Sequence, residues 1–338
     1  MVALTVAATD YHTAGEPFRI ATEGVPDIAG ATVRERRETA RADPELNRIR
    51  RLLGHEPRGH ADMYGCFLVP PDDDGAEFGV LFWHKDGYST ACGHGTIALG
   101  VWAADTGRVA CDPDGVTDVP IDVPSGRVVA RVRRSGARTV AVTFRSVASY
   151  VLARQVELPT SRGDVVVDVS YGGAIYASLD VASIGLRVTP DHYAALLDLG
   201  REVRRTLDGT PLARHPSDLR LSGMYGTILF EDLGRTATGP RQRNVTVFAN
   251  GAVDRSPCGS GTAARVALLA ADGALADGAT LTHESIVGTT FTAHVAERVT
   301  VEGRPGVVPE IEGMAYPTGE HRFVLCADDP LGAGFVLR

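Results

Sequence analysis

The chain carries the same short pattern twice, about half its length apart. Residues 92–107 read CGHGTIALGVWAADTG, and residues 258–273 read CGSGTAARVALLAADG. When Cys92 is set on Cys258, both glycines and the threonine of each motif coincide, and upstream Phe82 falls on Phe248. In a chain of 338 residues, two copies of one unit predict two similar domains facing each other across a pseudo-twofold axis. The alternative is a chance likeness between two glycine- and alanine-rich helix starts.

Each copy places a cysteine before Gly-x-Gly at the start of a helix-like stretch. The glycines allow a tight turn and leave backbone N–H groups uncovered. Together with the positive end of the helix dipole, these groups form an anion site that suits a substrate carboxylate. The same position lowers the pKa of a thiol, so we expect a thiolate to be accessible near neutral pH.

Two related turns of this kind indicate proton transfer at a carbon. Inverting a stereocentre needs a base on one face and an acid on the other, and two thiols can exchange these roles. We therefore interpret Cys92 and Cys258 as catalytic thiols that act on a small amino acid. Helix N-termini aimed at its carboxylate would stabilise the developing charge, so no cofactor is needed. Asp254 could hold the substrate nitrogen or cap the helix. His94 could bind the carboxylate or orient a thiol, or its hydrogen bonds could be satisfied within its own loop.

The remaining pattern predicts an α+β fold with mainly antiparallel or mixed sheets. Two helices are expected at Thr32–Leu53 and Asp191–Leu207, and two more just after the paired cysteines. Segments rich in β-branched and aromatic residues predict strands. These are Leu4–Thr9, Phe78–His84, Val119–Val123, Val128–Val132, Thr139–Phe144, Asp164–Val169 and Val245–Ala249.

Charge and composition exclude several classes of partner. The net charge of −8 argues against a nucleic-acid or anionic-membrane surface. No run reaches the ~18 apolar residues of a membrane span, and the N-terminus lacks the basic leader of a signal peptide. Five cysteines, an odd number, suggest free thiols in a cytoplasmic protein. We expect Cys66, Cys111 and Cys326 to be packing residues and Lys85 to lie in a surface turn.

The chain resembles the proline racemase family, which includes hydroxyproline 2-epimerases and trans-3-hydroxyproline dehydratases. The motifs that carry this resemblance run from end to end of the sequence. They are Asp10–Pro17, Glu56–His60, Asp62–Gly65, Gly87–Tyr88, Cys92–Thr96, Asp254–Gly261 and Asp328–Phe335.

The resemblance implies a diaminopimelate-epimerase-like fold, in which two pseudo-symmetric halves each wrap a sheet around a central helix. We expect the first half to comprise residues 1–136 with a C-terminal return of 325–338, and the second half residues 137–324. Cys92 and Cys258 would be the paired acid/base thiols, with no metal and a small amino acid as the substrate. The resemblance also implies that the carboxylate is held by Gly93, His94, Gly259 and Ser260, the ring nitrogen by Asp254, and the ring by Tyr64 and Phe248.

Three functions are weighed at this point. Racemisation or epimerisation of proline or a hydroxyproline leads, because dehydratases of this family typically have threonine where this chain has Cys258. Dehydration of trans-3-hydroxy-L-proline is the second, since the Gly87–Thr90 stretch looks dehydratase-like. The Tyr64 hydroxyl bears on the substrate, because it could pair with a substrate hydroxyl, but it could equally face solvent. A non-catalytic or metal-binding protein is the third, with Cys92 and His94 as a chelating pair that has no counterpart in the second copy. A homodimer is left open.

Overall fold

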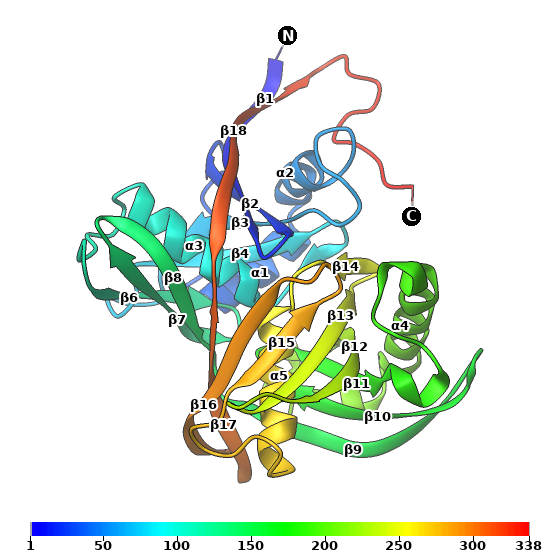
Figure 1. Cartoon of the computed structure of the whole chain (residues 1–338). Helices are drawn as coiled ribbons and strands as arrows, with labels where there is room; N and C mark the ends of the chain where they lie inside the picture. The colour runs from blue at the N-terminus through cyan, green and yellow to red at the C-terminus, as the bar shows by residue number, and fades with distance from the viewer. Residues whose placement is uncertain (1, 338) are drawn as a thin grey trace. The chain divides into compact units, whose positions relative to one another are not determined.

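The computed structural model describes residues 2–337 and has an α+β fold made of two compact units. Unit 1 comprises Met1–Val142 and Met314–Arg338, and unit 2 comprises Thr143–Gly313 (Figure 1). These boundaries lie after residue 142 and after residue 313, whereas the sequence suggested residues 136 and 324.

Unit 1 builds its sheet from both ends of its chain. The strand β1 (Val2–Thr13) pairs antiparallel with β18 (Ala315–Cys326) and with β2 (Glu16–Glu23). From β2 the sheet continues through β3, β4, β6 and β7, with β2–β3 and β4–β6 parallel and the other pairs antiparallel. The remaining bounds are β3 Tyr64–Val69, β4 Phe78–His84, β5 Gly87–Tyr88, β6 Val116–Val123, β7 Gly126–Ser135, β8 Arg138–Arg145 and helix α3 Gly93–Asp105.

The prediction of a single helix at Thr32–Leu53 is wrong, because the structure has two helices in this segment. These are α1 (Val33–Ala42) and α2 (Pro44–Gly54). Pro44 has no N–H to donate to the preceding turn, so it ends the first helix and suits the first position of the next. Asp43 caps α2 by accepting from the N–H groups of Glu45 and Leu46. Apolar residues of both helices bury against the sheet, beside Phe67, Leu81 and Trp83.

Unit 2 closes its strands around a central helix. Successive pairings run β9–β10–β11–β12–β13–β15–β16–β17 and return from β17 to β9. The helix α5 (Gly259–Ala271) contacts β9, β10, β11, β16 and β17. Helix α4 (Tyr193–Leu207) packs instead against β9, β12 and β13, where Leu199, Val203 and Val247 are buried. The strand bounds are β9 Ser149–Thr160, β10 Gly163–Tyr171, β11 Ile175–Asp180, β12 Met224–Arg235, β13 Pro240–Phe248, β14 Ala252–Asp254, β15 Leu281–Ser285, β16 Thr290–Val301 and β17 Arg304–Gly313.

The internal repeat is visible in how each unit is built. In unit 1 a parallel pair, an antiparallel pair, a short hairpin and a helix follow one another as β2–β3, β3–β4, β4–β5 and α3. In unit 2 the same series is β11–β12, β12–β13, β13–β14 and α5. Both helices have 13 residues and begin directly after a cysteine. The predicted fold class, with a helix at the centre of each half, is confirmed.

The other predicted elements also appear. All seven predicted strands fall on observed strands: Phe78–His84 has the bounds of β4, the other six patterns are shorter than the strands that they indicated, and Ala249 lies one residue beyond β13. The helix expected at Asp191–Leu207 begins at Tyr193, after a short 3-10 turn at Pro190–His192. Within residues 2–337, no helix is both long enough and apolar enough to cross a membrane.

Candidate active site

Cys92 stands at the N-cap of α3, where its sulfur accepts a hydrogen bond from the backbone. Its φ of −156° is ordinary extended backbone, and the Gly95 N–H lies 3.2 Å from the sulfur. Both ring nitrogens of His94 lie 3.5 Å from the same sulfur. The thiol is thus held by the first turn of a helix, with an N–H group aimed at it. This is the arrangement that the first Cys-Gly-x-Gly turn predicted.

The second glycine of this turn is required by space. A Cβ built on Gly95 would meet the ring of Phe18 at 2.4 Å and the Cys92 sulfur at 2.8 Å, both closer than real contacts. Gly93 and His94, the residues between, are buried in the same turn. The Thr13 hydroxyl donates to the His94 carbonyl at 2.9 Å and fixes the turn against β1.

Tyr64 points toward the residues around Cys92 and away from solvent. Its ring meets the His94 ring edge-on, with centroids 5.0 Å apart, and its side chain is 2% exposed. Its hydroxyl lies 2.5 Å from the Ser89 hydroxyl. Of the two orientations left open by the sequence, the structure has the buried one. Unit 1 therefore brings Cys92, His94 and Tyr64 together, with the Ser89 hydroxyl beside Tyr64.

Cys258 stands at the start of α5 in a strained conformation. Its φ is +63° and its ψ is 103°, a region that residues with a side chain rarely adopt. Such a conformation costs about 1–3 kcal/mol and persists only when surrounding contacts hold it. As in the first copy, the second glycine is required, because a Cβ on Gly261 would meet the Cys258 sulfur at 2.9 Å. The two cysteines occupy matching places in the repeat, yet their backbones differ.

The pKa of the Cys258 thiol is raised well above its usual value. Burial is the main cause and the negative charge of Asp254 the second, while hydrogen bonds from the Gly261 N–H and the Thr246 side chain act in the opposite direction. For this cysteine the expectation of a lowered pKa is therefore wrong. The helix N-terminus acts on the sulfur, but removal from water outweighs it, since the side chain is only 5% exposed.

Asp254 is buried beside the cysteine and shapes the turn that carries it. Its Oδ1 accepts from the Ser256 N–H at 2.8 Å and from the Ser256 hydroxyl at 2.7 Å. The Ser256 hydroxyl oxygen in turn accepts from the Cys258 N–H at 3.0 Å. Asp254 thus organises the turn that precedes α5, where Cys258 and not Asp254 is the N-cap residue, and it also lies against the thiol itself.

Aromatic rings connect the other predicted residues of unit 2. Phe248 stacks on Tyr225, with centroids 5.7 Å apart, and Tyr225 meets Tyr176 edge-on at 5.6 Å. The Tyr176 hydroxyl lies 2.7 Å from the Ser260 hydroxyl and 4.0 Å from the Cys258 sulfur. Gly259 and Ser260 are buried in the first turn of α5. Unit 2 therefore brings Phe248, Ser260 and Cys258 into one cluster.

The side chains predicted to have no role in the site differ in how deeply they are buried. Cys66 is fully buried, and burial raises its pKa, as a packing thiol requires. Cys111 is half-buried, whereas Cys326 is exposed, so the packing prediction is wrong for Cys326. Lys85 is also not a surface residue, because its side chain is 2% exposed and pairs with Asp86 at 2.7 Å. Among residues 2–337, no three His, Cys, Asp or Glu side chains are grouped so that they could hold a metal ion.

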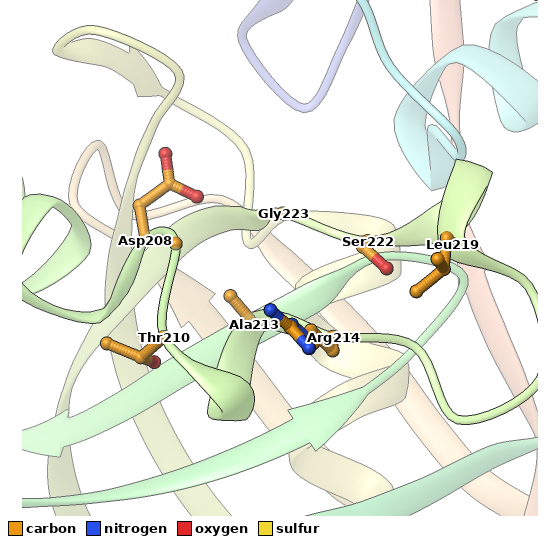
Figure 2. A pocket seen from close by; sticks show the side chains of 8 residues that line it. Asp208, Thr210, Ala213, Arg214, Leu219, Ser222 and Gly223 are labelled. Carbon is orange, nitrogen blue, oxygen red and sulfur yellow. The ribbon is translucent and has the colours of Figure 1, made fainter.

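A pocket of about 450 Å³ lies elsewhere in unit 2, on the segment between α4 and β12. Figure 2 shows the side chains that line it, and none of the predicted site residues is among them. They are Asp208, Gly209, Thr210, Ala213, Arg214, Leu219, Ser222 and Gly223.

Comparison with known proteins shows the family of the chain. The model of the family described as proline racemase matches residues 8–336. The chain belongs to the proline racemase family. It is 42% identical to a trans-3-hydroxy-L-proline dehydratase from Burkholderia cenocepacia and 41% identical to a 3-hydroxyproline 2-epimerase from Burkholderia multivorans. Each alignment covers 100% of this chain and 99% of the relative.

The solved structures agree on the fold of this proline racemase family member. A hydroxyproline epimerase from Agrobacterium vitis, solved with bound trans-4-hydroxy-L-proline, has a TM-score of 0.91 at 29% identity, covering 100% of this chain and 97% of that one. A phenazine-biosynthesis protein of the PhzF family from Bacillus anthracis aligns with a TM-score of 0.58 at 11% identity and shares the fold alone.

Sequence reasoning missed several residues around Cys258. Tyr176, Asn244, Thr246 and His283 all lie outside the repeated motif, so nothing in the repeat pointed to them. Thr262 is in the motif but was read only as a marker of the repeat. The one available signal was a histidine, His283, inside a strand-like stretch, where a fully buried imidazole needs a polar neighbour.

Proposed function

We propose that the protein is a cofactor-independent epimerase that inverts Cα of a hydroxyproline by acid/base catalysis with two thiols, Cys92 and Cys258. The observation that carries this proposal is the duplicated turn: a buried cysteine directly precedes α3, another directly precedes α5, and in each turn a Cβ on the second glycine would collide with the sulfur. A single nucleophilic cysteine would not require the second copy.

The two cysteines start from different protonation states in this mechanism. Cys258, with its raised pKa, begins as the thiol, and Cys92, whose sulfur accepts the Gly95 N–H, acts first as the base. Cys92 takes the Cα proton from one face while Cys258 gives its proton to the other. The product leaves the pair with exchanged roles, and the reverse reaction restores them.

The remaining predicted residues would bind the substrate. Gly93, His94, Gly259 and Ser260 lie in the first turns of α3 and α5, where N–H groups and helix dipoles favour a carboxylate. Charge that develops as the Cα proton leaves would be stabilised by the same groups. Asp254 would accept from the ring nitrogen, and the rings of Tyr64 and Phe248 would contact the pyrrolidine.

A hydroxylated ring is favoured over proline itself. The paired hydroxyls of Tyr64 and Ser89 are buried beside His94, and a substrate hydroxyl could join them. The relatives at 41% and 42% identity are both named for 3-hydroxyproline, so the hydroxyl at C3 is the first one to test.

Dehydration of trans-3-hydroxy-L-proline is the second candidate, because a relative at 42% identity is named for it. One thiolate would take the Cα proton, the electron pair of that C–H bond would form a C2–C3 double bond, and the C3 hydroxyl would leave with a proton as water. The resulting enamine would tautomerise to a cyclic imine. Cys258, a thiol beside Asp254, would supply the proton to the departing hydroxyl.

Incubation in D₂O separates these reactions. The purified protein is given proline and each 3- and 4-hydroxyproline isomer, and Cα deuterium, C2 configuration and imine formation are followed by NMR. Epimerisation gives deuterated product of inverted configuration, and dehydration gives the imine. The Cys92→Ser/Cys258→Ser double variant is the control. Absence of exchange and of imine with every substrate would refute the proposal, and so would full turnover by the double variant.

A further inference from the structure

The peptide between Pro257 and Cys258 is held at both ends by buried side chains. On its carbonyl side, Pro257 O accepts from Asn244 Nδ2 at 3.0 Å and from the Thr262 hydroxyl at 3.1 Å. On its amide side, the Cys258 N–H donates to the Ser256 hydroxyl at 3.0 Å. Because the plane of this peptide sets the φ of Cys258, these three contacts oppose its relaxation to an ordinary negative φ.

The geometry points to Asn244, Thr262 and His283 as positioning residues that hold the Pro257–Cys258 peptide in its strained form, and with it the Cys258 sulfur in place for proton transfer. This inference rests on the proposed function, since it assigns the three residues to one of the two thiols. Asn244 and His283 are fully buried, on β13 and β15, and Thr262 is fully buried on α5.

His283 acts through Thr262. Its Nδ1 lies 2.8 Å from the Thr262 hydroxyl oxygen, and its Nε2 is buried without a hydrogen-bond partner. The Thr262 hydroxyl has one hydrogen. If Nδ1 carries the imidazole proton and donates it to the Thr262 oxygen, the Thr262 hydroxyl hydrogen must point to the Pro257 carbonyl. Nε2 then has no hydrogen, so the only unpaired atom of the ring is an acceptor. Burial lowers the pKa of His283 to about 3, so the ring stays neutral and keeps this single donor.

The first copy of the repeat lacks this support. Its matching threonine, Thr96, donates to the carbonyl of Cys92 itself at 2.8 Å, and Ala91 stands where the second copy has Pro257. Phe78 occupies the position that the repeat matches to Asn244. Cys92 has ordinary backbone angles and needs no such restraint. The support therefore belongs to one thiol, and its loss should affect that thiol alone.

Alkylation measured by mass spectrometry tests the inference, because the two cysteines can be compared within each sample. Iodoacetamide is added to the unaltered protein and to the Thr262→Val, His283→Leu and His283→Asn variants, and the modification rates of the Cys258 and Cys92 peptides are compared. In the valine and leucine variants the Cys258:Cys92 rate ratio should rise at least threefold, because the released peptide lets the buried sulfur swing toward solvent. The kcat/KM for the substrate should fall tenfold or more, mainly through kcat.

The asparagine variant and a matched threonine distinguish positioning from stability. His283→Asn keeps a side-chain N–H for Thr262 and should restore the ratio to within twofold of the unaltered protein. Thr96→Val removes the equivalent hydroxyl from the first copy and should leave the Cys258 rate unchanged. A ratio unchanged in both Thr262→Val and His283→Leu, or rates that rise in parallel for both cysteines, would overturn the inference. Failure of the proposed function would show separately, as absence of Cα exchange in the unaltered protein.

Discussion

Substitution of one glycine should damage catalysis without unfolding the protein. In Gly261→Ala the new Cβ would lie 2.9 Å from the Cys258 sulfur, where ordinary contact begins at 3.4 Å, and its other neighbours are Cys258 Cβ at 3.2 Å and Ile228 Cδ1 at 3.4 Å. The sulfur must therefore move by about half an ångström to restore ordinary contact. Because a displacement of about 1 Å of a reacting group can cost ~100-fold in rate, we expect kcat/KM to fall about tenfold.

The stability of this variant should change little. Alanine is favoured over glycine in a helix by about 1 kcal/mol, and overpacking costs about 1–3 kcal/mol, so the net loss is about 0–2 kcal/mol. For a unit of this size, that is a fall in Tm of no more than about 8 °C. Deuterium exchange at Cα gives the rate, and circular dichroism gives the Tm.

A second glycine supplies the control. Gly100 lies within α3, and its added Cβ would meet Ala130 Cβ at 2.8 Å, away from the Cys92 sulfur. Gly100→Ala should lower the Tm by a similar or larger amount while the rate changes less than twofold. Full activity in Gly261→Ala would refute the reasoning, as would an equal loss of activity in Gly100→Ala, because the sulfur contact would then not be the cause.

Three further predictions address the thiols, the ring pocket and acid stability. Cys92→Ser and Cys258→Ser should each lower the epimerisation rate by about 10²–10⁴-fold, measured by chiral chromatography, because each removes one acid/base group. Tyr64→Phe should lower kcat/KM for the hydroxylated substrate by about tenfold and leave that for proline within twofold, since only the hydroxyl is lost; equal effects on both substrates would contradict this. Burial lowers the pKa of His84 and His283 from 6.5 to about 3, so the unfolded chain binds more protons below pH 6.5 and stability is lost as the pH falls toward 3. Urea midpoints between about pH 7 and 4.5 should show a loss of about 3 kcal/mol for His283, and His283→Asn should have a visibly flatter profile.

The sequence was most informative where one short pattern determines local structure. A cysteine followed by Gly-x-Gly and an alanine-rich stretch specifies a helix start, and both α3 and α5 begin where that pattern predicts. The break at Pro44 was also available from the sequence, since proline cannot continue a helix, but the spacing of apolar residues across it favoured one helix instead of two.

The properties that depend on distant segments could not be predicted. The raised pKa of Cys258 comes from burial by residues of several strands, and its positive φ is held by Asn244 on β13 and His283 behind Thr262. Local pattern gives the position of a helix dipole but not the extent to which water is excluded from it. The local pattern therefore predicted correctly that Cys258 lies at the start of a helix, but it predicted a lowered pKa where the structure has a raised one.

The pairing of β1 with β18 has a consequence for the order in which the chain can fold. Unit 2 is one continuous segment, so all of its strands are available once residue 313 has left the ribosome. One of the two partners of β1 in unit 1, however, is β18 (Ala315–Cys326), which follows unit 2 in the sequence. On the ribosome, β1 must therefore wait until β18 has emerged before that edge is covered. We expect a chain truncated after Gly313 to contain a protease-resistant second unit and a protease-sensitive first unit.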